Sequence, residues 1–199
     1  DGSFLALGQA PEKDITTFTV QLPIDGATAL QLDLLTDKSL PKNGPGRAEN
    51  GNLHLSKIVV RVNGELVKIT RAEADFNQDG WAIEHAIDAN PDSAWGIHPQ
   101  EGQTHRAVFV FKKPLVGSKG DPIEVELHQL HGRKHLIGRP RLAITNSSKP
   151  IFNKPVTLQS EEILAINPDK RSKEQKHALA FYFAKDTNDR DLASLGAQN

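Results

Sequence analysis

Hydrophobic residues through the first three quarters of this chain recur at every second position. Such alternation predicts strands with one face in a core and the other in solvent. It covers Phe18–Leu22, Leu30–Leu34, Ile58–Val62, Ile123–Leu127 and Leu142–Ile144. A period of two cannot form the hydrophobic stripe of a helix, so this part of the chain is restricted to β-structure.

Two further segments refine the prediction. Ala107–Phe111 is hydrophobic at every position, which indicates a central strand buried on both faces. Asn63 and Gly64 stand between two strand-like runs and predict a two-residue hairpin turn. Many short strands separated by polar loops indicate a jelly-roll antiparallel β-sandwich, all-β, over residues 1–155.

The period changes after Pro150. Ser160–Ile166 has the pattern of a short helix, and Ser172 with Gln175 has the spacing of a capping box. We therefore predict a helical extension or linker over residues 156–199, with no catalytic constellation of its own.

Charge and composition narrow the range of partners. The 24 basic residues nearly balance the 25 acidic ones, so no field favours nucleic acid or an anionic membrane. No hydrophobic run reaches the length of a membrane span. Cysteine is absent, so we expect no haem attached in this segment. The start lacks signal-peptide features, so we interpret the chain as a mature or excised fragment.

An oxygen-rich loop is the first candidate site. Asp88, Asn90, Asp92 and Ser93 lie within six residues, shortly before Trp95. Ca²⁺ takes six to eight oxygen ligands, so this density suits a structural calcium site. The same residue types are preferred in tight turns. Both interpretations stay open at the level of sequence.

Aromatic and imidazole side chains flank this loop. Trp81 follows a turn at residues 78–80 and is a candidate surface platform, since an indole face stacks on a sugar ring. Trp95 closes the oxygen-rich loop and is predicted to be core. His98 and His105 are further candidates for contact with a ligand.

A glycine-rich loop over residues 42–52 supplies Arg47 and Asn50. It lacks the Lys-Ser/Thr ending of a phosphate-binding loop. We expect its glycines to adopt positive φ angles, which would let these side chains bond neighbouring loops. A structural pin and a ligand contact both remain possible roles for Arg47.

Three histidines, His128, His131 and His135, fall within eight residues. Imidazole is a common transition-metal ligand, but Arg133 in the same segment opposes a cation. The alternatives are a metal site, a solvated loop and a hydrogen-bonded core histidine. No Ser-His-Asp set or isolated carboxylate pair indicates catalysis, so we expect no enzyme.

The segment Ala86–Trp95 resembles the signature of the discoidin, or coagulation-factor C-type, domains. Asp88, Asn90, Ser93 and Trp95 fall on its positions, with Ser in place of Thr and Ala in place of Gly. The resemblance implies a galactose-binding-like jelly roll with a structural Ca²⁺ and a loop end that binds sugars, lipids or proteins.

A second resemblance covers most of the chain. Gly2–Gly8, Gly44–Arg47, Asn50–Asn52 and Leu136–Leu142 look like an internal module of the large secreted cytochrome-c-like proteins typical of planctomycetes. That family carries its haem in other segments. The resemblance implies a secreted or periplasmic location and a role in recognising polysaccharide.

The favoured hypothesis is a non-catalytic carbohydrate-binding module with polysaccharide as its partner and a calcium-stiffened loop. The alternative is a docking or spacer domain that contacts neighbouring domains of the same polypeptide. The candidate ligand-binding residues are Trp81, His98, His105, Arg47 and Asn50, and the candidate metal ligands are Asp88, Asn90, Asp92 and Ser93.

Overall fold

The computed structural model describes residues 1–148, 163–172, 175–176 and 179 of the chain. The chain divides into two compact units, Asp1–Phe152 and Asn153–Asn199. All the strands described below lie in the first unit.

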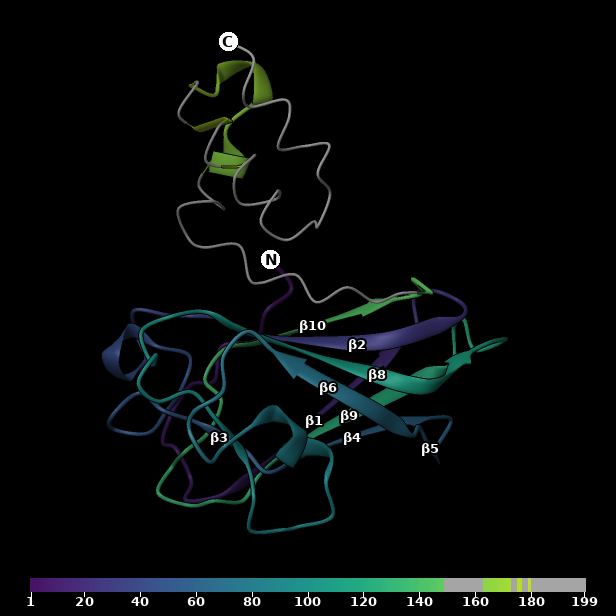
Figure 1. Ribbon diagram of the computed structural model, residues 1–199, viewed down its shortest axis with the longest axis horizontal. Helices are drawn as coiled ribbons and strands as arrows, with labels where there is room; N and C mark the ends of the chain where they lie inside the picture. Colours follow the sequence, from purple (N-terminus) through teal and green to yellow (C-terminus); the bar gives the residue numbers. More distant parts are fainter. Residues whose placement is uncertain (149–162, 173–174, 177–178, 180–199) are drawn as a thin grey trace. The chain divides into compact units, whose positions relative to one another are not determined.

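Two antiparallel four-stranded sheets form the first unit, and the all-β prediction is confirmed (Figure 1). The first sheet has the order β1 (Asp14–Gln21), β9 (Pro122–Gln129), β4 (Lys57–Val62) and β5 (Glu65–Leu66). The second has the order β10 (Pro140–Thr145), β2 (Ala27–Leu34), β8 (His105–Leu115) and β6 (Ile69–Ala74).

A short two-stranded ladder lies outside these sheets. β3 (His54–Leu55) pairs with β7 (Trp95–Gly96), so that His54 lies opposite Gly96. Two 3-10 helices, η1 (Pro41–Asn43) and η2 (Ile83–Ile87), lie in the loops around it. This ladder brings two loop segments together beside the end of β9.

Both four-stranded sheets contribute side chains to one hydrophobic core. The alternation at Ile123–Leu127 buries every second side chain, as the period of two predicts. On β2 the leucines at 30, 32 and 34 are buried in the same way, but Asp33 between them is also only 1% exposed. Strand β8 pairs with β2 on one side and β6 on the other, and Ala107, Val108 and Phe109 are all buried. The prediction of a central strand is confirmed.

The hairpin turn is also confirmed. Asn63 and Gly64 join β4 to β5 with φ angles of 51° and 80°. Two successive positive φ angles are what a type I′ turn requires, and Asn-Gly is its preferred sequence.

In the second unit, the described residues include the capping box. Ser172 N–H donates to Gln175 Oε1 (2.9 Å), and Gln175 N–H donates to Ser172 Oγ (3.2 Å). This reciprocal pair is the predicted capping box, and residues 175 and 176 are helical. Of the predicted helix at Ser160–Ile166, residues 163–165 are helical, and η3 (Pro168–Lys170) follows. The remaining predictions over 156–199 lie outside the described residues.

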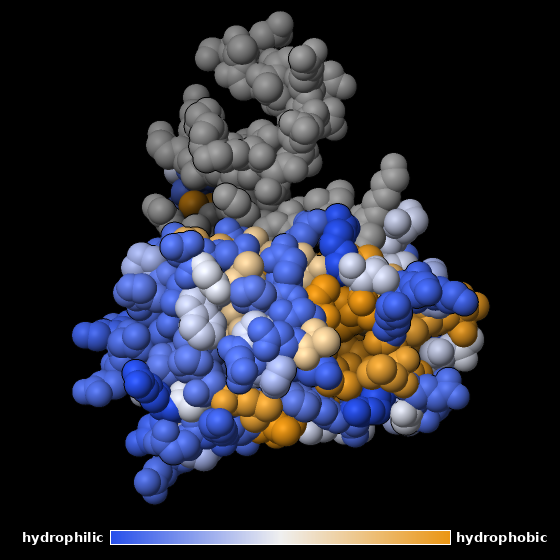
Figure 2. All heavy atoms as spheres, turned by 60° about the horizontal axis from the view of Figure 1, so that its bottom comes forward, coloured by the Kyte–Doolittle hydropathy of each residue, from blue (hydrophilic) through white to orange (hydrophobic). Residues whose placement is uncertain are grey.

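The surface of the first unit is mixed. Hydrophobic side chains gather toward one end of the face in Figure 2, among mainly hydrophilic neighbours. Val20, Leu66 and Val116 are among the exposed large hydrophobic residues. Among the residues that the structure describes, no helix combines the length and hydrophobicity that crossing a bilayer requires.

Candidate metal centre

Three imidazoles from two distant segments meet beside the β3–β7 ladder. His54 lies on β3, whereas His131 and His135 lie in the loop that follows β9. One ring nitrogen from each lies within 4.8 Å of the other two. Nitrogen ligands of this kind suit zinc, copper, nickel or iron. We refer to these three residues as the histidine cluster.

The loop that carries His131 and His135 has an unusual backbone. Gly132, Arg133 and Lys134 have φ angles of 93°, 52° and 58°. A left-handed conformation costs a non-glycine residue about 1 kcal/mol or more, so the turn stores strain at two positions. This tight turn reverses the chain direction, so that the side chains of His131 and His135 both reach His54.

Hydrogen bonds fix the orientation of His135 in this loop. Its backbone N–H and its Nδ1 both lie close to the carbonyl oxygen of Gly132, at 3.1 and 3.0 Å. A carbonyl can only accept, so Nδ1 carries the hydrogen and the Nε2 lone pair is left for a ligand. Metal-binding histidines are commonly oriented in this way by a second hydrogen bond.

His54 is the most informative member of the cluster. Its side chain is only 3% exposed, and among the described residues neither ring nitrogen has a hydrogen-bond partner. A buried polar group without a partner costs about 1–3 kcal/mol, so native structures rarely retain one without a reason. Its backbone N–H donates to His135 O (3.0 Å), which ties the strand to the histidine loop.

Burial also sets the protonation of the cluster. Desolvation, reinforced by the charges of His131 and His135, lowers the pKa of His54 to about 3. The nearby Gln78 amide opposes this shift, although its geometry forms no hydrogen bond with the imidazole. Burial, followed by the charges of His135, Arg133 and Lys13, lowers the pKa of His131. A neutral imidazole is the form that binds a metal.

Aromatic stacking holds the His54 ring in place. Trp81 stacks on it at 4.3 Å between ring centroids and 8° between planes, and His135 stacks at 4.6 Å and 9°. His131 meets the same ring edge-on at 4.1 Å. Trp81 is itself fixed, because Gly96 N–H donates to its carbonyl oxygen (3.0 Å).

Gly96 makes room for the cluster. A Cβ atom at this position would lie 2.9 Å from both Cδ2 and Nε2 of His54, and 2.6 Å from Gln78 Oε1. Real Cβ atoms do not approach other atoms so closely, so only glycine accommodates the imidazole here. The Gln78 oxygen is held by Asn52 Nδ2 (3.0 Å) and His98 N–H (3.1 Å).

The cluster has the dimensions of a site that closes around an ion. Zinc binds imidazole nitrogen at about 2.0–2.1 Å, so tetrahedral ligands lie about 3.3 Å apart. The 4.8 Å span therefore requires the nitrogens to close by up to about 1.5 Å. His131 is exposed and can supply part of this movement by rotating its side chain. The rings of His54 and His135 stack at 9° between planes, so the His135 ring must also turn before both lone pairs can meet one ion.

The oxygen-rich loop lies at the surface after η2, with Asp88, Asn90 and Asp92 exposed and Ser93 half-buried. Ser93 Oγ lies 2.9–3.0 Å from both Asp88 carboxylate oxygens and 2.9 Å from Asn90 O. Asp88 Oδ1 also accepts from Asn90 N–H (2.8 Å). The oxygens of Asp88, Asn90 and Ser93 converge, and both Asp88 carboxylate oxygens already accept a local hydrogen bond.

The structure separates the predicted ligand contacts. Trp81 is half-buried, with His54 on its ring face, and His98 is exposed beside the Glu101 carboxylate. His105 is only 1% exposed, with its ring nitrogens 3.1 Å from Asp75 Oδ2 and 2.9 Å from a backbone carbonyl. His105 therefore lies in the interior, away from any surface ligand. Trp95 is fully buried, as predicted.

The glycine-rich loop holds its position through close backbone contacts. Arg47 Nη2 donates to Gly8 O (2.7 Å), and Asn50 Oδ1 accepts from Asn52 N–H (3.0 Å). The expectation of positive φ is confirmed for Gly51, whose φ is 83°, and is wrong for Gly44, whose φ is −91°. This glycine is required because a Cβ there would lie 1.9 Å from Glu101 O.

Two of the three histidines singled out in the sequence join the site. His128 does not, because it lies on β9 with Nε2 2.7 Å from Glu126 Oε2. Sequence reasoning missed His54 and Gly96. A histidine between two leucines in a buried strand is the one local signal that could have drawn attention to His54.

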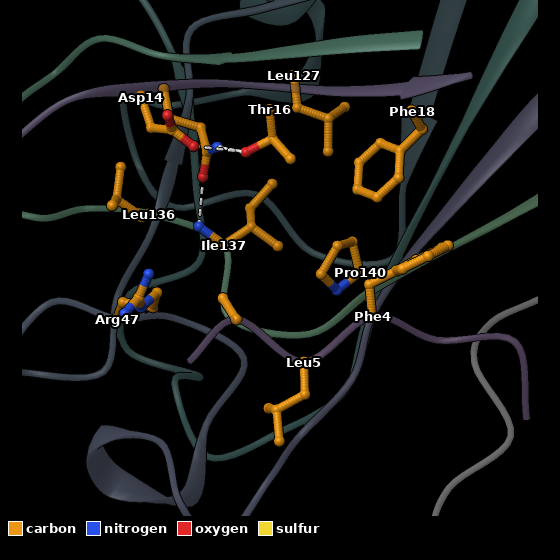
Figure 3. Close-up of a pocket in the computed structure, with 12 residues that line it drawn as sticks. Phe4, Leu5, Asp14, Thr16, Phe18, Arg47, Leu127, Leu136, Ile137 and Pro140 are labelled. Carbon is orange, nitrogen blue, oxygen red and sulfur yellow. Dashed lines mark hydrogen bonds between the residues drawn. The ribbon is translucent and has the colours of Figure 1, made fainter. Parts of the chain in front are cut away.

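A small cavity lies between the N-terminal segment and β1 (Figure 3). Its lining is mainly hydrophobic, with the rings of Phe4 and Phe18 5.0 Å apart. The amide of Gln129, one of the lining residues, is hydrogen-bonded within the fold to Thr16 Oγ1 (3.0 Å) and to Ile137 N–H. Among the described residues, the buried side-chain atoms that lack a hydrogen-bond partner are therefore the two ring nitrogens of His54, in the histidine cluster.

Compared with protein-family models, curated proteins and solved structures, the chain shows no match. Its function is therefore argued from the geometry of the site.

Proposed function

We propose that this domain binds one transition-metal ion through His54, His131 and His135. The observation that carries the proposal is the buried His54 imidazole, which has no hydrogen-bond partner on either nitrogen among the described residues. It lies within reach of two further imidazole nitrogens. A metal ion would bind the lone pair of one His54 ring nitrogen and offset the free-energy cost of burying that nitrogen without a partner.

The chemistry of the ligands selects the class of metal. Three neutral nitrogen donors suit Zn²⁺, Cu²⁺ or Ni²⁺, whereas Ca²⁺ and Mg²⁺ require oxygen. The His135 Nδ1 to Gly132 O hydrogen bond supplies the second-shell contact that such sites use to orient a ligand. The lowered pKa of His54 keeps it ready to bind across the neutral range.

Isothermal titration calorimetry of the full chain with ZnCl₂ tests the proposal. We expect one Zn²⁺ per chain, with affinity reduced at least about 100-fold in the double variant His131→Ala/His135→Ala. The matched control is His128→Ala, which removes a histidine outside the cluster and should bind as the wild type does. Equal affinity in wild type and double variant would contradict the proposal.

A second function is favoured by the convergent oxygens of Asp88, Asn90 and Ser93. We propose that this loop is a structural calcium site, in a jelly-roll sandwich of galactose-binding-like type that binds polysaccharide outside the cytoplasm. Thermal melts in Ca²⁺ and in chelator test the calcium site, with Asp88→Ala as the variant. Affinity electrophoresis on polysaccharide gels tests glycan binding, which predicts retardation that Trp81→Ala abolishes.

A further inference from the structure

The inference rests on the proposed metal site and concerns what completes it. We propose that the metal held by the histidine cluster takes a small oxyanion, a carboxylate or a phosphate, as an exogenous ligand, drawn in by Lys13 and Arg133.

The charge of the site favours an anion. Imidazole ligands are neutral, so three of them leave the full charge of a divalent ion uncompensated. Zinc sites with three protein ligands keep a fourth position open to water or substrate. A negatively charged oxygen at that position neutralises the ion and completes a tetrahedron.

The surroundings add further positive charge. Lys13 and Arg133 both act electrostatically on His131. Lys13 Cε lies 3.6 Å from where a Cβ of Gly132 would stand, so its ammonium group is beside the histidine loop. The opposing charge is Glu12, whose Oε2 accepts from Arg133 N–H (3.1 Å). With Lys13 and Arg133 against Glu12, the exposed side of the histidine cluster carries a net positive charge before any metal binds.

Access to the ion is one-sided. His54 is buried beneath the site and stacked on Trp81, whereas His131, Lys13 and Arg133 are exposed. A small anion can therefore reach the ion from the histidine loop, without disturbing the β3–β7 ladder. The β3–β7 ladder therefore closes the buried side of the site, and Lys13 and Arg133 lie on its exposed side.

Visible absorption of the full chain loaded with one equivalent of Co²⁺ tests the inference. The titrants are sodium acetate and inorganic phosphate, at ionic strength held constant with perchlorate. We expect a saturable change in the cobalt bands for either anion, and the stronger response identifies the preferred class. In Lys13→Gln/Arg133→Gln we expect anion affinity to fall about fivefold or more, because two attractive charges are lost.

Separate measurements distinguish failure of the inference from failure of the metal site. Calorimetry with Co²⁺ should give equal or tighter metal binding in the Lys13→Gln/Arg133→Gln variant, since a cation is no longer repelled. Lys113→Gln, at the far end of β8, is the matched charge control and should leave anion affinity unchanged.

Three outcomes would overturn the inference. Cobalt bands that do not respond to either anion, with metal bound, refute the exogenous ligand alone. An equal response in the double variant refutes the role of Lys13 and Arg133. Absence of cobalt binding to the wild type refutes the metal site, and the inference falls with it.

Discussion

The oxygen-rich loop and the histidine cluster are two candidate metal sites built in opposite ways. The loop gathers Asp88, Asn90 and Ser93 from six successive residues at the surface. The cluster gathers the buried ring of His54 with His131 and His135, which lie 77 and 81 positions later in the sequence. In the loop both carboxylate oxygens of Asp88 already accept a hydrogen bond, whereas both nitrogens of His54 have none among the described residues.

This contrast shows that a high density of metal-ligand residue types in the sequence does not indicate which polar groups lack hydrogen-bond partners in the fold. Residues that are close along the chain satisfy one another through turns, as Ser93 and Asp88 do. Residues brought together by folding can be left with unmet hydrogen-bonding capacity, and that deficit is what a ligand fills. The predictions below test this difference, from the largest expected effect to the smallest.

Zinc should stabilise the protein through the cluster and not through the loop. At 100 times Kd, bound zinc adds about 2.7 kcal/mol to the unfolding free energy, or about 5–10 °C in Tm. We expect His54→Phe to lose most of this shift and Asp88→Asn to keep it. Differential scanning calorimetry with zinc and with chelator measures both shifts. Loss of the Tm shift in Asp88→Asn, with the shift retained in His54→Phe, would show that zinc binds at the loop and not at the cluster.

Acid should destabilise the metal-free protein through His54. Its folded pKa is about 3, below its unfolded value near 6.5, so the unfolded state takes up a proton first. Stability is therefore full above pH 6.5 and falls as the pH drops toward 3, by about 2–3 kcal/mol at pH 4 after allowance for solvent. Urea unfolding in chelator should show a smaller loss in His54→Phe than in the wild type.

His54→Phe should also be nearly as stable as the wild type in chelator at pH 7. Phenylalanine keeps the ring that stacks on Trp81 and removes two unsatisfied nitrogens. A large loss of stability would indicate that the ring nitrogens have structural partners.

Gly96→Ala should distort the cluster, because its Cβ would collide with His54 and Gln78. We expect a loss of about 1–3 kcal/mol and weaker zinc binding. Gly102→Ala is the matched control, since its Cβ would meet nothing closer than 3.8 Å. Urea unfolding and zinc calorimetry on both variants measure the effect, and tolerance of Gly96→Ala would show that the His54 ring can move.

The loop should give the smallest loss of stability among the substitutions expected to destabilise the protein. Ser93→Ala removes a hydroxyl that bonds Asp88 and Asn90 at the surface, and should cost about 0.5–1 kcal/mol without calcium. Zinc affinity should not change. A fall in zinc affinity would mean that the loop and the cluster are coupled.

Much of the fold could be predicted from local pattern. The alternation at Leu30–Leu34 and the Asn63-Gly64 turn both gave the observed strands and hairpin, because a strand and its turn are specified by neighbouring residues. The double-sided burial at Ala107–Phe111 likewise indicated its central place. The order of strands in each sheet had no such local signal.

The site was predicted only in part. His131 and His135 were singled out because they are close in the sequence, and His128 was grouped with them for the same reason. Pairing of β9 in the sheet directs His128 toward Glu126, whereas the left-handed turn carries the other two elsewhere. His54 was missed because its partners are distant in sequence.

The sequence by itself determined that this chain forms antiparallel strands, since hydrophobic period and turn residues act over a few positions. It also determined that the oxygen-rich loop would close on itself or on an ion. Only the tertiary structure decided which histidines meet, because the pairing of His54 with Gly96 and the turn at Gly132 are contacts between distant segments. Burial then removed water from His54, and created the unmet hydrogen-bonding capacity on which the proposed function rests.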